Sequence, residues 1–148
     1  MTEIAGRLAD GLHALPVRVY YEDTDFSGAV YHANYLKFCE RGRSDFLRLI
    51  GIHHNEIASA EQGGLAFVVR HMDCDFHRRA MIDDLLTVET RFVEYAGARM
   101  VLRQQVKREA ELLFDATVTV ALIDRSGRPR RFPEKMRAAF AAFLPSQS

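Results

Sequence analysis

The sequence predicts an α+β domain in which a curved antiparallel sheet of about five strands wraps around one long central helix. Apolar or small residues recur at helical spacing over residues 35–49. Over residues 65–122, apolar and polar side chains alternate in four successive runs, the pattern of half-buried strands. Because one helix cannot cover a flat sheet of this size, we expect the sheet to curl around it.

The remaining elements follow from turn residues and periodicity. Residues 17–21 alternate as an opening strand, and a weak helical turn through Ile4, Leu8 and Leu12 is expected before it. The long helix is expected over residues 34–50 and is capped by Gly51. A loop with one helical turn spans residues 53–64, and a short terminal helix begins at Pro133. In the first strand of the later sheet, one face is expected to hold Val68, Met72, Cys74 and Phe76, with Arg70 out of pattern.

The whole chain predicts one soluble domain, residues 1–148, with its core at about 15–140. Its formal charge is zero and its pI near 7, which argues against a nucleic-acid partner. The start of the chain lacks the features of a signal peptide, and no apolar run approaches the length of a membrane span. Cys39 and Cys74 are interpreted as small hydrophobic residues in a reducing compartment, so the expected location is cytoplasmic.

A carboxylate-rich turn lies directly before the long helix, and it contains Asp23, Asp25 and Gly28. The first turn of a helix leaves backbone N–H groups unpaired and carries the positive end of the helix dipole. A carboxylate beside such amides forms a minimal acyl-transfer site, with one acid or base and one oxyanion stabiliser. Gly28 lacks the Cβ that would obstruct a ligand. Asp23 is interpreted mainly as a turn former.

The same stretch resembles a known family. Residues 19–43, VYYEDTDFSGAVYHANYLKFCERGR, resemble the signature D-x-D-x-x-G-x-V-x-x-x-x-Y of the YbgC-type acyl-CoA thioesterases. These enzymes have the hotdog fold and are relatives of the 4-hydroxybenzoyl-CoA thioesterases. The matching positions are Asp23, Asp25, Gly28, Val30 and Tyr35.

The resemblance implies hydrolysis of an acyl-CoA thioester, or of an acyl group borne by acyl carrier protein. Asp25 matches the catalytic carboxylate, which acts as nucleophile or general base, and the backbone N–H near His32 matches the group that polarises the carbonyl. The expected substrate-binding residues are Gly28, Val30, Tyr31 and Tyr35. No metal or redox cofactor is implied, and the six histidines show no recognisable ligand spacing.

The resemblance also implies an assembly. Protomers of this family pair into a homodimer with a continuous sheet, and dimers often associate into a homotetramer. The weakly polar strand face formed by Thr117, Thr119, Ala121 and Ile123 independently suggests a partner subunit. Similar proteins are linked to the Tol-Pal envelope machinery, which this sequence by itself does not indicate.

The sequence departs from the family where coenzyme A is held. In the aromatic-acid branch, basic residues before the third strand of the later sheet hold the nucleotide, whereas here the turn is Ala96, Gly97 and Ala98 with only Arg99 basic. The remaining basic cluster is Arg128, Arg130 and Arg131, which are the candidate phosphate contacts.

Several alternatives stay open. The His32 side chain either takes part in the chemistry or is a polar surface residue. Tyr35 either lines an acyl pocket or packs in the core, and Gly42 admits either a strand or a partner helix. A hotdog dehydratase acting on 3-hydroxyacyl thioesters would pair His32 with Asp25. A non-catalytic acyl-binding or scaffold subunit is the second rival.

Overall fold

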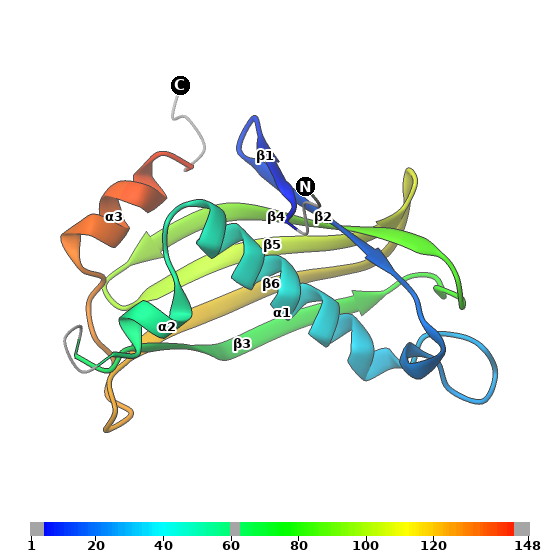
Figure 1. The fold of residues 1–148 in the computed structure, drawn as a ribbon, viewed down its shortest axis with the longest axis horizontal. Coiled ribbons are helices and arrows are strands. Elements are labelled where there is room, and N and C mark those ends of the chain that lie inside the picture. The colour runs from blue at the N-terminus through cyan, green and yellow to red at the C-terminus, as the bar shows by residue number, and fades with distance from the viewer. Residues whose placement is uncertain (1–4, 60–62, 144–148) are drawn as a thin grey trace.

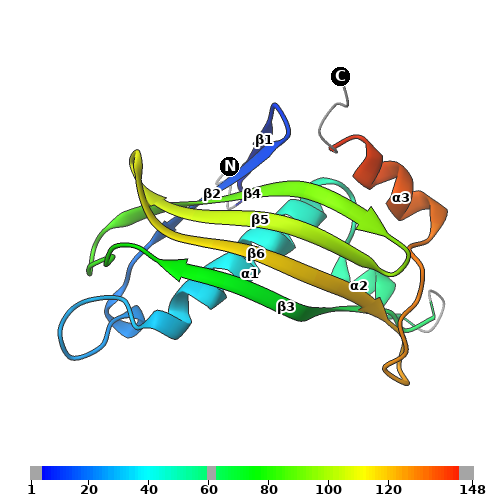
Figure 2. The same cartoon turned by 180° about the vertical axis from the view of Figure 1, so that it is seen from behind.

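The computed structural model describes residues 5–59 and 63–143. These residues form a six-stranded antiparallel sheet in the order β1-β2-β4-β5-β6-β3. The long helix α1 lies across one face of the sheet (Figure 1), and Figure 2 shows the opposite face with no helix over it. In chain order the elements are β1 (Arg7–Ala9), β2 (Leu12–Arg18), the 3-10 turn η1 (Tyr21–Asp23), α1 (His32–Leu49), α2 (His54–Ile57), β3 (Ala66–Phe76), β4 (Leu85–Ala96), β5 (Arg99–Arg108), β6 (Glu111–Ile123) and α3 (Glu134–Ala141). This confirms the predicted α+β class, with one strand more than expected.

The helix α1 forms where its apolar stripe predicts it, two residues earlier than expected. Phe38, Cys39 and Phe46 on that stripe are fully buried against the sheet. At the C-terminal end, Gly51 adopts the left-handed conformation (φ 92°), and the amide of Ile52 donates to the carbonyl of Leu47 at 2.8 Å. The predicted glycine cap is therefore confirmed.

The four later strands are also confirmed, but the face assignment along β3 is wrong in part. A bulge between Val69 and His71 leaves Arg70 outside the register. Val68 pairs with Ala121 on the outer face, whereas Met72 pairs with Val118 on the inner face. One extra residue reverses the alternation, so Val68 does not share a face with Met72, Cys74 and Phe76.

The predicted N-terminal helical turn is wrong for Leu8 and Leu12. Ile4, its third residue, lies outside the described residues. Leu8 and Leu12 instead belong to a β-hairpin, whose turn is formed by Asp10 and Gly11 with φ of 53° and 76°. An Asp-Gly pair with both φ values positive matches the twist of a two-residue hairpin, and this signal outweighs the weak helical spacing.

A buried polar contact attaches this hairpin to α1. The His13 Nε2 atom lies 2.6 Å from Oδ2 of Asp45, and the Gly6 amide donates to the same oxygen at 2.8 Å. His13 is completely buried. A carboxylate at this depth is tolerated because it is hydrogen-bonded, and nothing in the helical pattern predicts it.

The short helices α2 and α3 lie at the end of the sheet opposite the start of α1 (Figure 1). The single helical turn α2 falls within the loop where one was expected, and Pro133 directly precedes α3, whose Met136 and Phe140 point inward as predicted. Within the described residues, every helix is too short or too polar to cross a bilayer.

Gly42 lies where α1 comes closest to the sheet. A Cβ added there would lie 2.9 Å from Cγ1 of Val88, 3.2 Å from Nε2 of Gln104 and 3.3 Å from Oγ1 of Thr90. These atoms belong to β4 and β5, so the close approach expected at Gly42 is made by strands of the same chain.

We predict that Gly42→Ala destabilises the protein. Overpacking a well-filled core costs about 1–3 kcal/mol, and replacing a helical glycine by alanine returns at most about 1 kcal/mol. Urea unfolding at matched protein concentration measures the difference, with the exposed Arg41→Ala as control, expected within about 0.5 kcal/mol of the parent. A Gly42→Ala variant more stable than the parent would contradict this packing.

Candidate active site

The acidic turn is a closed loop attached to the end of the sheet. The amide of Asp25 donates to the carbonyl of Ala29 at 2.9 Å, and the amide of Val30 donates to the carbonyl of Ala80 at 2.8 Å. Gly28 has φ of 84°, and a Cβ added there would meet only a methionine methyl at 3.9 Å. Glycine is therefore needed for the backbone conformation, and the expected close approach of a ligand to it stays a prediction.

One oxygen of the Asp25 carboxylate is held and the other is free. Oδ1 accepts the Ser27 amide at 2.8 Å and the Ser27 hydroxyl at 2.5 Å. No hydrogen-bond partner of Oδ2 occurs in the described part of the chain. The Ser27 hydroxyl and then the Ser27 amide lower the pKa of Asp25, desolvation opposes them, and the charge of Arg79 adds a lowering effect that is weaker than either hydrogen bond. The carboxylate is thus ionised at neutral pH.

The start of α1 offers unpaired amides beside this loop. The Tyr31 amide donates to the carbonyl of Asp23 at 3.0 Å, and the Asn34 side chain donates to the same carbonyl at 2.8 Å. No side chain caps the helix at Tyr31. Across residues 5–59 and 63–143, the amides of His32 and Ala33 have no hydrogen-bond acceptor, as the first turn of a helix leads one to expect.

Asp23 shapes the turn, as predicted. Its carboxylate accepts the amide of Tyr20 at 2.9 Å, and its carbonyl fixes the helix start. The Tyr20 contact gives this carboxylate a structural role, and Asp23 is not among the residues that line the hollow at the start of α1.

A hollow of about 480 Å³ brings most of the predicted residues together. Five of the nine predicted site residues line it, whereas Gly28, Arg128, Arg130 and Arg131 do not. Residues that the sequence interpretation did not single out as site residues also contribute. The lining consists of Asp25, Ser27, Ala29, Val30, Tyr31, His32, Tyr35, Phe76, His77, Arg78 and Arg79.

Tyr35 packs in the core and also lines the hollow. It is 4% exposed and stacks on Phe114, with ring centroids 5.3 Å apart and planes inclined by 11°. Its hydroxyl oxygen accepts the amide of Ala80 at 2.9 Å, and burial raises its pKa. Tyr35 is therefore a core residue whose edge forms a wall of the hollow.

His32 contributes its ring to the hollow without a carboxylate partner. Its ring lies 4.4 Å from that of Tyr31 and edge-on to Phe76 at 6.3 Å, both measured between centroids. Among the described residues, no ion pair or hydrogen bond joins His32 to Asp25. Both residues nevertheless line the same hollow.

Comparisons with known proteins agree on one family. Residues 27–114 match the model of the Thioesterase superfamily. The acyl-CoA thioesterase YbgC of Haemophilus influenzae is 42% identical over 134 residues, which cover 90% of this chain and 97% of that protein. The chain belongs to the thioesterase superfamily. A probable thioesterase from Bartonella henselae, solved by crystallography, is 50% identical with a TM-score of 0.80 and covers 82% of this chain and 99% of that one.

A more distant thioesterase has a different named substrate. The chloroplastic acyl-acyl carrier protein thioesterase ATL3 of Arabidopsis thaliana is 26% identical over 94% of this chain and 73% of that protein. The fold match to thioesterases confirms the predicted hotdog architecture.

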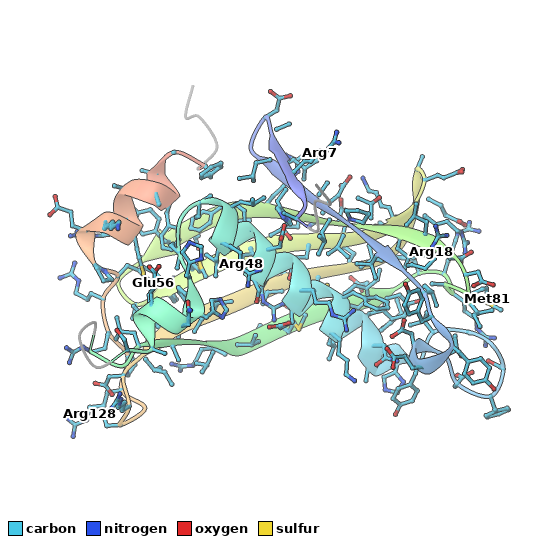
Figure 3. All side chains as sticks on the ribbon, in the orientation of Figure 1. Arg7, Arg18, Arg48, Glu56, Met81 and Arg128 are labelled. Atoms are coloured by element: carbon cyan, nitrogen blue, oxygen red, sulfur yellow. The ribbon has the colours of Figure 1, made fainter. Side chains whose placement is uncertain are left out.

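The predicted phosphate contacts of this thioesterase lie far from the hollow. Figure 3 shows Arg128 and Met81 at opposite ends of the molecule, and Met81 pairs with Ala29 of the acidic loop. Arg130 lies 3.6 Å from the carboxylate of Asp124 at the far end. Within one protomer, Arg128, Arg130 and Arg131 therefore do not meet Asp25.

Two other arginines do line the hollow. Arg78 and Arg79 lie two and three residues after the end of β3, and the sequence analysis did not single them out. Arg78 pairs with Glu111 at 3.3 Å. Their position at the end of the strand that carries Phe76 was the available signal. In the described ranges no three His, Cys, Asp or Glu side chains gather as a metal site would require.

Proposed function

We propose that this thioesterase hydrolyses acyl-CoA. One observation supports this most strongly: an ionised carboxylate with a free oxygen and the unpaired amides of a helix start lie at one hollow. An acyl-transfer site needs both parts. The Haemophilus relative is named an acyl-CoA thioesterase, which fits this chemistry.

The geometry suggests how each group acts. The thioester oxygen would accept a hydrogen bond from the amide of His32 or Ala33, where the negative charge of the tetrahedral intermediate is stabilised. Asp25 would attack the carbonyl carbon through Oδ2, expelling the thiolate and forming an anhydride that water then cleaves. As general base, Asp25 would instead remove a proton from the attacking water. In both routes one water is consumed, and a carboxylic acid and coenzyme A are released.

The acyl chain has an apolar path leading away from Asp25. Phe76 lines the hollow, and Cys74 and Met72 follow it on the inner face of β3. Met72 and Cys74 are only partly buried and Phe76 is 53% exposed, unlike the inner faces of β4 and β5, because α1 packs mainly on β2, β4 and β5. From Phe76 to Met72 the path is about 13 Å long at roughly 3.3 Å per residue. We define Met72, Cys74 and Phe76 as the inner strip.

A second copy of the chain is expected along β3. This strand is eleven residues long and ends the sheet, so its outer edge has no partner within the described chain. A long unpaired edge favours pairing with another strand. A two-fold antiparallel pairing would place the Ala66 end of the partner beside Phe76. Within each protomer Ile123 pairs with both Ala66 and Pro129, so Arg128 lies near the Ala66 end of β3. This pairing would therefore bring the partner's Arg128 towards the hollow, and the predicted phosphate contact would be made between protomers.

Further association and location remain part of the proposal. The outer face of β6 is available for pairing dimers into a tetramer, with Thr117, Thr119 and Ile123 only half-buried.

Burial raises the pKa of the Cys39 thiol to about 12, and both cysteines are free, as expected in a reducing cytoplasm. Acyl carrier protein is the alternative acyl donor, since ATL3 is named for it. The relatives named as thioesterases favour hydrolysis over a dehydratase or a scaffold.

We predict that Asp25→Asn lowers thioesterase turnover by about 10²- to 10⁴-fold, because the variant keeps the shape of the side chain without its negative charge. Free thiol release from a panel of acyl-CoA and acyl carrier protein thioesters measures the rate. Asp124→Asn, which alters a carboxylate distant from Asp25 within the protomer, is the matched control and should retain the parent kcat at saturating substrate, because the neighbouring Arg128 and Arg130 are proposed to affect only coenzyme A binding. Unchanged rates for Asp25→Asn on every thioester would remove Asp25 from the mechanism.

We predict that Cys74→Phe shortens the accepted acyl chain, because the larger side chain fills the inner strip. The value of kcat/KM should fall by about tenfold or more for long acyl chains, while the shortest chains are hydrolysed as before. Asp73→Phe places the same group on the outer face of β3 and should leave the chain-length profile unchanged. Equal losses at all chain lengths for Cys74→Phe would place the acyl chain elsewhere.

A further inference from the structure

The turn that carries Asp25 occurs twice in this chain. Residues 25–28 and 124–127 both have the sequence Asp-x-Ser-Gly. In each, Oδ1 of the aspartate accepts the serine amide, at 2.8 and 2.9 Å, and the serine hydroxyl, at 2.5 Å in both. The glycines have φ of 84° and 83°, and their amides donate to the aspartate carbonyls at 3.1 and 2.9 Å. The local structure is therefore the same.

The two carboxylates differ in what else they contact. Oδ1 of Asp124 also accepts the Arg128 amide at 3.1 Å, and its Oδ2 lies 3.6 Å from Nη1 of Arg130. For Asp25, the described chain provides partners to Oδ1 only, and the residue lines the hollow beside the start of α1. In the turn at Asp124 both carboxylate oxygens contact other groups of the protein, whereas in the turn at Asp25 the described chain contacts only Oδ1 and leaves Oδ2 available.

We propose that Ser27 is a positioning residue, whose hydroxyl and amide hold Oδ1 of Asp25 so that Oδ2 is presented to the thioester. This inference rests on the proposed function of Asp25. Two donors on one oxygen restrict rotation of the carboxylate, and a fixed orientation reduces the cost of reaching the reactive geometry. The backbone amide is supplied by any residue at position 27, whereas the hydroxyl is specific to this side chain.

The same contacts favour the ionised carboxylate. The hydroxyl is the largest cause of the lowered pKa of Asp25, followed by the Ser27 amide, with Arg79 contributing less. Besides Arg79 and the tyrosines, the ionisable residues that line the hollow with Asp25 are His32, His77 and Arg78. None of these three side chains can carry a negative charge. Removing the hydroxyl raises the pKa of Asp25, so activity that needs the ionised form is lost at a higher pH as the solution is acidified.

The test compares Ser27→Ala with Ser126→Ala, which removes the same hydroxyl from the second copy of the turn. Thiol release from one acyl-CoA is followed across the acidic range, and kcat and KM are separated. For Ser27→Ala we expect the acidic limb of kcat to move to higher pH and kcat at neutral pH to fall by about tenfold, with KM unchanged. Ser126→Ala should keep the parent kcat and its acidic limb, and Ser27→Thr, which retains a hydroxyl, should keep them as well.

The results separate this inference from the proposed function. If Asp25→Asn is inactive but Ser27→Ala and Ser27→Gly both show the parent kcat and acidic limb, Ser27 does not position Asp25. A shifted limb in Ser126→Ala would equally overturn the inference, because a general effect of the turn would then explain the result. If Asp25→Asn keeps full activity, the proposed function itself fails.

Discussion

The arrangement depends on a short stretch of backbone pairing between the acidic loop and the segment that follows β3. The Val30 amide donates to Ala80 and the Ile82 amide donates to Gly28, at 2.8 and 3.1 Å. Ala80 is completely buried and also donates to the hydroxyl of Tyr35 on α1. Each bond contributes only about 0.5–1.5 kcal/mol, but together they fix loop, sheet end and helix start to one another. The carboxylate and the unpaired amides meet for this reason.

Incomplete coverage of the sheet links substrate and assembly. Because α1 packs mainly on β2, β4 and β5, the inner side chains of β3 remain partly exposed while those of the central strands are buried. The same strand also has a free edge. An acyl chain on its inner face and a second protomer along its edge would each bury surface that one chain leaves open.

Local patterns predicted most of the fold, and long-range register limited the rest. The helical stripe located α1 and Gly51 marked its end, since both signals lie within a few residues. The hairpin at Asp10 was missed although its Asp-Gly pair was visible. The prediction of which face Val68 occupies was wrong because a one-residue bulge at Arg70 has no reliable sequence signal. Asp25, Val30 and His32 meet as expected because they are close in sequence. Arg79 reaches the hollow only because of how β3 pairs in the sheet. The strand pairing also places Arg128 at the opposite end of the molecule.

The central claim is that the thioester lies between the free oxygen of Asp25 and the start of α1. A crystal structure with an acyl-CoA analogue in which a methylene group replaces the thioester sulfur tests it most directly. The account predicts that the carbonyl oxygen accepts a hydrogen bond from the amide of His32 or Ala33, with Oδ2 of Asp25 facing the carbonyl carbon or a water beside it. A carbonyl bound elsewhere, with Asp25 directed to solvent, would contradict the account.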